Sequence, residues 1–460
     1  MSEWFESLDY DVIVIGGGPA GVVSAIAAAR GGAKVLLVER HGFLGGMLTA
    51  AGTGPMMSFH AGNTQVVRGI PDEIVQRLVK MDMSPGHLED FVGFCSSVTP
   101  FSSEALKRVM EEMCIEAGVK LLYHTRFIDC KKKDDSITSV RLFAKNGFFE
   151  ARAKVFIDAS ADADLSVSAG VGTVYGRESD NNAQAMTLNM LVGGVDREKM
   201  MDYVIDNQDD MLETIPFDHL REIPRAGIQG GRSLLERARQ EGKITVPNKD
   251  MLVFETNTKG QVIVNMTHMY NLNSVDAMGL TEAEIDGRRQ AWELFGFLKE
   301  YVPGFENAHL IQTGPNIGIR ESRKINGVYK LTDKDVATNV MFPDAVAMGG
   351  YPIDVHLPRA NGSENEIRYT LEEGTWYSVP YRCLVTNEVR NLIVAGRCIS
   401  TTHRACGATR VTPVLMAIAQ GAGSAAAIAA KAGCHVRDID VEALRTTLKN
   451  DGAFLEEYHK

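Results

Sequence analysis

Hydrophobic residues at the start of the chain come in short continuous runs separated by segments of small residues. Residues 11–15 form an unbroken, mostly β-branched run, which is typical of a parallel strand buried on both faces. A glycine-rich turn follows, then an alanine-rich stretch over 22–30 with helical spacing, and a second apolar run over 33–39. The pattern predicts a strand, a helix and a second parallel strand in succession.

The next segment begins with helices and then changes to short strands. The spacing predicts helices over 71–80 and 103–117 and a strand over 119–127. Between 126 and 158 the apolar runs are short and separated by turn residues, including Asn146-Gly147, a strong signal for a two-residue hairpin. We therefore expect a small antiparallel meander over 126–158.

A long middle segment lacks the strand–helix–strand repeat. It mixes expected strands over 251–255, 261–266 and 317–329 with a polar helix over 282–300, and the first pattern returns as a strand over 391–396 and a helix over 413–431. The predicted fold class is α/β: a discontinuous Rossmann-type domain with a small β-meander, interrupted by a mixed α+β cap domain. The expected bounds are 8–176 and 381–435 for the two pieces of the first domain, 177–380 for the cap and 436–460 for a C-terminal helical tail.

Composition narrows the class of protein. The chain has 460 residues, 45% hydrophobic and 23% charged, which is ordinary for a folded globular protein. A formal charge of −11 argues against nucleic acid or an anionic membrane surface as the main partner, because both need a basic footprint. Glycine, with 44 residues, is in excess and calls for an explanation.

Cysteine usage and the apolar segments favour a cytoplasmic protein. Seven cysteines without CxxC spacing indicate neither a disulfide framework nor a zinc site, so we expect no bound metal. The acidic start at 1–6 lacks the features of a signal peptide, and the apolar stretch 417–433 is interrupted and short for a membrane span. We expect no membrane partner.

A GxGxxG motif stands between the first expected strand and helix. Gly16 would allow a tight turn, Gly18 the close approach of a pyrophosphate, and Gly21 the packing of the helix on the strand. Glu39 ends the second strand 18 residues after Gly21, where its carboxylate can accept hydrogen bonds from an adenosine ribose and would repel the 2′-phosphate of NADP. A glycine turn in another α/β fold is the competing interpretation.

A second glycine pair distinguishes between the dinucleotides. Gly45 and Gly46 follow the ribose carboxylate, where a flavin dinucleotide, being longer, needs further backbone amides. With this pair the sequence resembles the flavin disulfide-reductase-like superfamily, and in particular the broad FAD-dependent oxidoreductase family. Segments 157–164, 318–327 and 391–400 are also similar to that family.

Two details of these segments matter for the comparison with the family. Ala161 stands where the family usually has glycine, and Gly396 is followed by Arg397 where the second FAD motif usually ends in Gly-Asp. The resemblance implies a glutathione-reductase-type domain that holds FAD noncovalently. The residues expected to bind FAD are Gly16, Gly18, Pro19, Ala20, Gly21, Glu39, Arg40, Gly45, Gly46, Met47, Phe127, Ala159, Asp164, Gly396, Arg397, Thr412 and Pro413.

The resemblance also implies that the helix beginning near Pro413 points its N-terminus at the pyrimidine edge of the flavin, where it would stabilise the negative charge of the reduced ring. The segment 377–412 before and into this helix carries five arginines and a single acid, Glu388. These arginines would stabilise the reduced flavin, the FAD pyrophosphate or an anionic substrate. Alternatively, they pair with acids elsewhere or reach solvent.

Proton transfer that accompanies hydride transfer needs a group that titrates near neutrality. His403 is the first candidate and His268 the second, although a structural histidine is an equally good interpretation of either. Arg320 or Arg323 could bind a substrate carboxylate or keto oxygen, although a strand with alternating charges is also typical of a half-exposed sheet. Arg410 is the other candidate catalytic arginine. Cys406 has no partner at CxxC or CxxxxC spacing, which argues against a disulfide-reductase mechanism.

The functional hypothesis follows from these motifs. No second strand–GxGxxG–helix unit occurs between residues 60 and 460, so we expect no separate NAD(P)H domain. The first hypothesis is an FAD-dependent oxidoreductase that exchanges a hydride between flavin N5 and a small organic substrate, anions included. The alternatives are a flavin-binding electron-transfer or metabolite-synthesis protein related to thiazole synthase, and an NAD-binding dehydrogenase. The substrate, the electron donor or acceptor and a homo-oligomeric state stay open at this stage.

Overall fold

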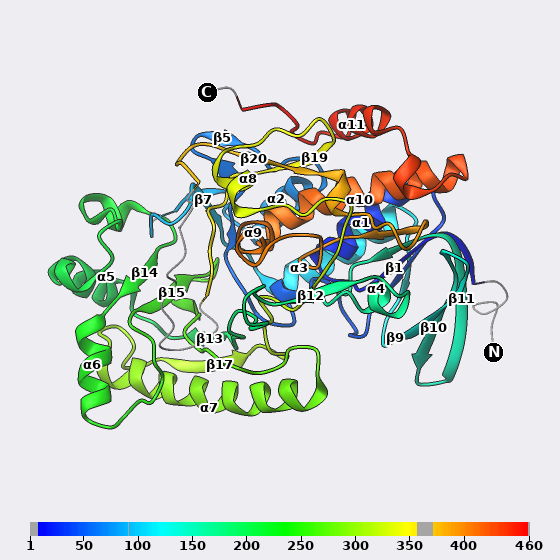
Figure 1. Cartoon of the computed structure of the whole chain (residues 1–460). Coiled ribbons are helices and arrows are strands. Elements are labelled where there is room, and N and C mark those ends of the chain that lie inside the picture. Colours follow the sequence, from blue (N-terminus) through cyan, green and yellow to red (C-terminus); the bar gives the residue numbers. More distant parts are fainter. Residues whose placement is uncertain (1–7, 91, 357–370, 459–460) are drawn as a thin grey trace.

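The chain forms a larger part around a mostly parallel sheet and a smaller part, the cap, around an antiparallel sheet (Figure 1). The computed structural model describes residues 8–90, 92–356 and 371–458, so the acidic start at 1–6 lies outside the described residues. Each part has its own hydrophobic core. The predicted fold class, an α/β domain interrupted by an α+β cap, is confirmed.

Parallel strands form the centre of the larger sheet. They are β1 (Asp9–Ile15), β2 (Val35–Val38), β8 (Lys120–Leu122), β11 (Gly147–Asp158) and β21 (Leu392–Val394). The order is β8-β2-β1-β11, and β21 also pairs with β11. All of β2 and the last four residues of β1 are buried, as expected for strands covered on both faces.

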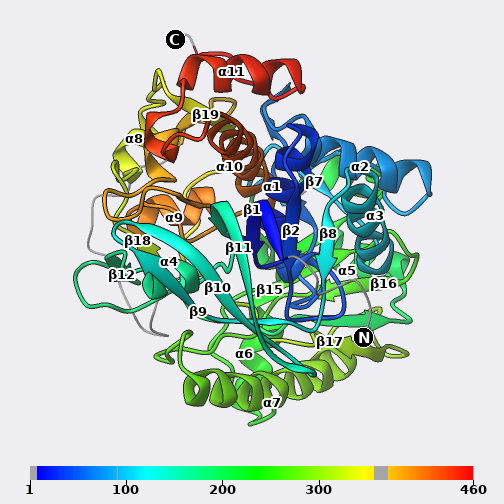
Figure 2. The ribbon, with the colours of Figure 1, turned by 90° about the vertical axis from the view of Figure 1, so that its right-hand side faces the viewer.

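The predicted meander is present and continuous with this sheet. β9 (Arg126–Lys133) and β10 (Ser136–Ala144) precede β11, and the turn between β10 and β11 falls at the predicted hairpin. The first half of β11 pairs antiparallel with β10, and its second half pairs parallel with β1. Figure 2 shows β10 and β9 continuing the sheet beyond β11.

Two helices, α1 (Pro19–Arg30) and α10 (Thr412–Ala432), run side by side in the same direction through the larger core (Figure 1). Ser24 Oγ donates to the carbonyl oxygen of Ala419 at 3.0 Å, and a Cβ added at Gly31 would lie 2.7 Å from that of Ala427. A Cβ at Gly423 would overlap the carbonyl oxygen of Ser24. The helices can touch this closely because glycine and alanine line the contact.

α10 corrects one expectation about apolar segments. The helix has 21 residues, so by length and composition it could cross a membrane, contrary to what the interrupted stretch 417–433 indicated. However, 89% of its apolar window is buried inside the protein. Its hydrophobic surface is already used in packing against α1 and the sheet.

The cap is built on a five-stranded antiparallel sheet of order β14-β15-β16-β13-β17. Figure 1 shows the long helix α7 running along this sheet, and the core between them contains Leu294, Phe297 and Leu298. The elements are β13 (Met190–Gly193), α5 (Arg197–Asp206), η3 (Gln208–Asp210), η4 (Phe217–Glu222), β14 (Gly227–Gly230), α6 (Arg232–Gln240), β15 (Met251–Glu255), β16 (Gln261–Val264), α7 (Ala277–Tyr301) and β17 (His309–Thr313).

The expected strand over 317–329 is wrong in extent. Only β18 (Arg323–Ile325) is a strand, and it pairs with β12 (Thr173–Tyr175) in a two-stranded ribbon. A ladder needs a neighbouring strand, and β12 offers only three residues; outside the ribbon this segment makes one isolated bridge, between Thr187 and Gly318. The ribbon lies where the chain enters and leaves the cap.

After the ribbon the chain packs into the larger core again. β19 (Ala345–Gly349) and β20 (Tyr377–Pro380) pair with each other, and their buried side chains belong to the core around α10. The domain bounds stay a prediction, but this packing indicates that the cap ends well before residue 380. The expected cap range also contains 357–370, which lies outside the described residues.

The remaining elements support the larger part, and the helical tail expected over 436–460 is helical only in its first half. These elements are η2 (Gly46–Leu48), β3 (Met56–Met57), β4 (His60–Ala61), β5 (Thr64–Gln65), α2 (Ile70–Lys80), β6 (Leu88–Glu89), β7 (Ser97–Thr99), α3 (Ser103–Glu116), α4 (Asp164–Ser168), α8 (Asp333–Ala337), η5 (Tyr381–Cys383), α9 (His403–Thr409), η6 (Val436–Asp438) and α11 (Val441–Asn450).

The turn after β11 contains a strained alanine. Asp158, at the end of β11, is fully buried and accepts hydrogen bonds from the backbone and hydroxyl groups of Ser160 and Ser166. These bonds fix the turn, in which Ala161 has φ +71°, a left-handed conformation that favours glycine. A glycine, which the family usually has at this position, would adopt this conformation without steric cost.

We predict that Ala161→Gly stabilises the protein by about 1 kcal/mol, because it removes the steric cost of a left-handed alanine. Urea unfolding of the FAD-bound protein measures the change. Ala29→Gly, at a helical position in α1, is the matched control and should destabilise by about 1 kcal/mol. Equal destabilisation by both substitutions would contradict the strain at Ala161.

Candidate functional site

The carboxyl ends of the parallel strands meet at one edge of the larger sheet. Ile15 of β1 is paired with Asp158 of β11, and Asp158 is paired with Val394 of β21. The residues that follow these strands, including Gly16, Ala159 and Gly396, therefore lie along the same edge. Dinucleotides bind at this edge in doubly wound α/β folds.

The glycine motif shapes a cradle at this edge. Gly16 has φ +103°, and a Cβ at Gly21 would overlap the carbonyl oxygen of Gly16, so these two glycines serve the turn and the packing. Gly18 differs, because the nearest atom to an added Cβ is Gly46 Cα at 4.0 Å. The backbones of Gly18 and Gly46 approach closely, since a Cβ at Gly46 would lie 2.9 Å from Gly18 Cα, and the open space beside Gly18 adjoins the first turn of α1, where Pro19 and Ala20 begin the helix. This arrangement fits a pyrophosphate, which would use the free N–H groups of the helix end.

Glu39 connects the second strand to the glycine loop. Its carboxylate accepts hydrogen bonds from the backbone N–H of Gly17 at 2.6 Å and of His41 at 2.8 Å, and its residue is only 7% exposed. A carboxylate has about four acceptor sites, so two stay available for a ribose diol. The neighbouring Arg40 guanidinium contacts His41 at 3.3 Å.

The second glycine pair joins the glycine loop to the cap. Gly45 donates its backbone N–H to the carbonyl of Gly17 at 2.9 Å, which places Gly46 opposite Gly18. Met47, the next residue, reaches toward the cap segment, where its Cε would lie 3.1 Å from a Cβ at Gly318. The segment thus spans the boundary between the two parts.

Other residues expected to bind FAD are placed less directly. Thr412 and Pro413 form the first turn of α10, which starts beside the N-terminus of α1 because the two helices are parallel. Phe127 is the second residue of β9. Asp164 is ion-paired with Arg323, and desolvation together with Asp162 and Asp158 raises its pKa to about 6.

The five arginines of 377–412 are neutralised by aspartates from other parts of the chain. The alternative interpretation, that these arginines pair with acids elsewhere, describes what the structure shows. Their expected role toward the flavin, the pyrophosphate or an anionic substrate stays a prediction. Charge counted along a segment misses partners that folding brings in from a distance. The pairs are Arg382–Asp344, Arg390–Asp135, Arg397–Asp162, Arg404–Asp333 and Arg410–Asp354.

Three of the four candidate catalytic residues come together where the cap meets the N-terminal end of α10. Arg410, two residues before α10, pairs with Asp354 at 3.0 Å, and Asp354 also lies 3.5 Å from His356. The ring of His268 lies 5.7 Å from that of His356. Arg320 influences the pKa of both histidines. We call these five residues the junction cluster.

Desolvation and charge determine the protonation of the junction cluster. Burial and the Arg320 charge lower the pKa of His268 well below its usual value and that of His356 to about 4. Burial opposes ionisation of Asp354, but His356 and Arg410 together keep its pKa below the usual value. Burial and Arg410 lower the pKa of Arg320 to about 9. At pH 7 both imidazoles are neutral, both guanidinium groups are charged and Asp354 is ionised.

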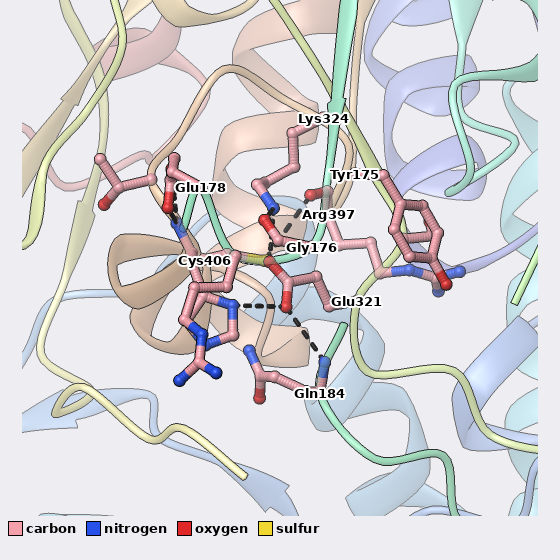
Figure 3. A network of polar contacts seen from close by, with 12 residues as sticks. Tyr175, Gly176, Glu178, Gln184, Glu321, Lys324, Arg397 and Cys406 are labelled. Carbon is pink, nitrogen blue, oxygen red and sulfur yellow. Dashed lines mark hydrogen bonds and ion pairs between the residues drawn. The ribbon is translucent and has the colours of Figure 1, made fainter. Parts of the chain in front are cut away.

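His403, the first candidate for proton transfer, lies in a different, buried network around Glu321, whose contacts with Lys324 and Gln184 are drawn in Figure 3. Its Nδ1 is 2.7 Å from Glu321 Oε2, and it is 2% exposed. Glu321 also binds the ammonium group of Lys324, which donates to the carbonyl of Gly176 at 2.9 Å. Gln184 donates its backbone N–H to Glu321 at 3.2 Å. We therefore assign His403 a structural place, while its catalytic role stays a prediction.

Cys406 lies in α9, three residues after His403. Burial, followed by the charge of Glu321, raises the pKa of its thiol to about 11. A thiolate is thus disfavoured at neutral pH. Within the described ranges, no group of three or more His, Cys, Asp or Glu residues is placed to hold a metal ion.

Sequence reasoning missed the residues that complete both clusters. Asp354 and His356 follow β19 in an irregular segment, and Glu321 precedes β18. The only local signal was the spacing Asp-x-His after Tyr351-Pro352, which is weak without a partner. Their roles become visible only when the chain returns from the cap.

A cavity of about 300 Å³ lies between the cap sheet and the larger part. Its walls come from η2 and the following loop, the start of α3, and strands of the cap. Among the described residues, those that line it do not include the junction cluster. Gln261 and Ile263 of the wall share a face of the chain with Asn265, which accepts a hydrogen bond from Arg320 at 3.4 Å.

The edge, the cradle and the parallel helices define a dinucleotide-binding flavoprotein. The model of the family described as FAD dependent oxidoreductase matches residues 11–448 of the chain. The chain belongs to this family, it is an enzyme, and FAD is its cofactor. This finding sets aside the hypothesis of an NAD-binding dehydrogenase.

Individual relatives are more distant. Aklavinone 12-hydroxylase of Streptomyces peucetius subsp. caesius is 29% identical over 151 residues, which are 28% of this chain and 31% of that protein. Thiamine thiazole synthase of Methanococcus maripaludis is 30% identical over 139 residues, 30% of this chain and 47% of that protein. The chain thus spans less than half the length of these curated relatives. The structure of p-nitrophenol 4-monooxygenase from Pseudomonas putida shares the fold, with a TM-score of 0.50 and 13% identity over 98% of this chain and 90% of that chain.

We predict that Glu39→Ala loses most of its bound FAD on purification, because it removes both the ribose acceptor and the hydrogen bonds that hold the glycine loop. The ratio of flavin to protein absorbance measures occupancy. Glu39→Gln keeps the size and the acceptor oxygen and should retain more FAD. Full occupancy in the alanine variant would exclude Glu39 from the ribose site.

We predict that Glu321→Ala lowers the free energy of unfolding by about 3–5 kcal/mol, because it leaves Lys324 and His403 buried without their carboxylate. Guanidinium unfolding followed by circular dichroism measures the loss. Glu104→Ala removes an exposed ion pair with Lys107 and should cost less than about 1 kcal/mol. Similar losses for both variants would contradict the importance of the buried network.

Proposed function

We propose that this FAD-dependent oxidoreductase exchanges a hydride directly between flavin N5 and a small organic substrate bound under the cap. The carrying observation is the junction cluster, in which cap residues His268 and Arg320 meet Arg410 just before the N-terminus of α10. The flavin, when bound, supplies the hydride acceptor or donor. The polar groups for substrate binding and proton transfer come from the chain itself.

The residues around the cofactor would have distinct tasks. The cradle at Gly18 and the first turn of α1 would bind the pyrophosphate, and Glu39 would bind the ribose. The first turn of α10 would stabilise negative charge on the reduced ring through its free N–H groups. The cap sheet, which closes over this edge, would keep water from the reacting atoms.

A neutral imidazole of the junction cluster would move the proton. His268 Nδ1 lies 3.3 Å from the side-chain amide of Asn248, which orients the ring. Its lowered pKa keeps the ring neutral at pH 7. It would take a proton from a substrate hydroxyl or amine at Nδ1, giving up the hydrogen bond from Asn248. His356, whose pKa is about 4, is equally neutral but is held by Asp354.

Two other functions have some support. The similarity to aklavinone 12-hydroxylase favours an oxygen-dependent hydroxylase as the second candidate, in which a nicotinamide would reduce the flavin. The similarity to thiamine thiazole synthase favours a metabolite-synthesis role, but the described part of this chain holds no clustered metal ligands. Direct exchange is preferred because the junction cluster provides both a base and cations beside the cofactor edge.

We predict that the purified protein is yellow and that one class of substrate bleaches its flavin absorbance without a nicotinamide. Anaerobic titration of the oxidised enzyme with hydroxy acids, sugars and amines tests this. Unsaturated acids are added after the flavin has been chemically reduced. His268→Gln should slow the flavin reaction by about 100-fold or more. Reduction by NADH or NADPH alone, followed by substrate hydroxylation in air, would support the hydroxylase instead.

His435→Gln is the matched control for the histidine. Its side chain is 41% exposed and pairs with Asp438 near the C-terminus, so the flavin reaction should keep its rate. If His356→Gln slows the flavin reaction and His268→Gln does not, His356 is the residue that transfers the proton.

A further inference from the structure

Arg320 is a buried cation without an acidic partner. Its residue is 5% exposed, and its guanidinium donates to the carbonyl of Ala185 at 2.7 Å and to Asn265 Oδ1 at 3.4 Å. In the described ranges it forms no ion pair with a carboxylate. Buried guanidinium groups are normally paired, because removing a charge from water is costly. This arginine therefore differs from the five arginines of 377–412.

The neighbours of Arg320 supply only part of the negative charge. Asp354, from the segment after β19, acts on the pKa of Arg320, but its carboxylate pairs with Arg410 and lies 3.5 Å from His356. His268 is neutral at pH 7, and burial raises the pKa of Tyr270 on the cap and of Tyr351 before Asp354, so both phenols are neutral as well. Counted over the described residues, two arginines and one aspartate leave one positive charge in excess at this site.

The site also offers hydrogen-bond donors that have no partner. The side chains of Asp354 and His356 are partly exposed, at 23% and 26%. Two donors beside them, Gln184 Nε2 and Arg410 Nε, are buried without a hydrogen-bond partner. Gln184 belongs to the site because its Oε1 accepts from the backbone N–H of His356 at 3.2 Å.

We infer that the substrate of this enzyme carries a carboxylate and that Arg320 binds it. The inference rests on the proposed function, because it places the substrate under the cap. A guanidinium matches a planar carboxylate with two parallel hydrogen bonds, and a single negative charge balances the excess. A phosphate fits less well, because its second charge would face Asp354.

Binding of matched acids and amides to the FAD-bound enzyme tests the inference. The probes are benzoate compared with benzamide, propionate compared with propionamide, and inorganic phosphate. Binding is measured by flavin difference absorbance and by titration calorimetry. The native enzyme should bind at least one acid about 10- to 100-fold more tightly than its amide. Arg320→Met should abolish this preference, and Arg320→Lys should retain part of it, because a point charge remains.

Arg382→Met is the matched control, since this arginine is 44% exposed and paired with Asp344. It should keep the full preference for the acid. Flavin content and thermal unfolding establish that each variant is folded. If Arg320→Met does not fold, Arg320→Lys is the test, and a reduced preference for the acid over its amide is the expected result.

Several results would overturn the inference. The native enzyme could bind acid and amide equally, or neither method could detect binding of either acid. Phosphate could bind more tightly than both acids, or the Arg320 variants could keep the full preference for the acid. An altered flavin reduction potential with unchanged acid binding would assign Arg320 to the flavin instead. Failure of the substrate panel to react with the flavin would refute direct exchange alone, because acid binding is measured without turnover.

Discussion

The contact between α1 and α10 is the constraint on which the rest of the structure depends. The two helices touch through glycine, alanine and serine, and a larger side chain at Gly423 would push them apart. Because they run in the same direction, their N-termini open side by side at the carboxyl edge of the sheet. In the proposed site, one terminus would serve the phosphates and the other would face the reactive end of the cofactor. A long cofactor would thus meet positive helix ends at two places separated along its length.

The cap is attached to this frame by two consecutive residues with opposite tasks. Arg320 lies at a bend and Glu321 in the irregular segment that leads into β18, and their side chains make separate sets of contacts. Arg320 faces the junction cluster, while Glu321 binds Lys324 and His403 in the buried interior. The buried carboxylate fixes the position of the segment, and the neighbouring guanidinium is thereby fixed as well. Positioning of the site therefore depends on a network that does not itself reach the substrate.

Local and periodic features could be predicted from the sequence, whereas pairings across the chain could not. The first strand, the glycine motif, Glu39 and the hairpin at Asn146-Gly147 follow from short patterns, and the structure places them as expected. The partners of the arginines of 377–412 could not be found this way, because Arg390 pairs with Asp135, which lies more than two hundred residues away. Asp354 had only the weak Asp-x-His spacing, and no pattern indicated that His403 lies buried against Glu321. Burial and partners are properties of the folded chain, so they escape a reading of residue types.

The two ends of the long strand β11 lie in regions that differ strongly in solvent exposure. The strand runs from the hairpin turn at Gly147 to the buried Asp158 at the cofactor edge, a distance of about 36 Å for an extended chain. Phe148, at the turn, is 66% exposed, whereas Asp158 has no exposed surface. The turn is therefore a point at which a fluorophore, an affinity tag or a surface tether can be attached to the enzyme without entering the chemistry of the site.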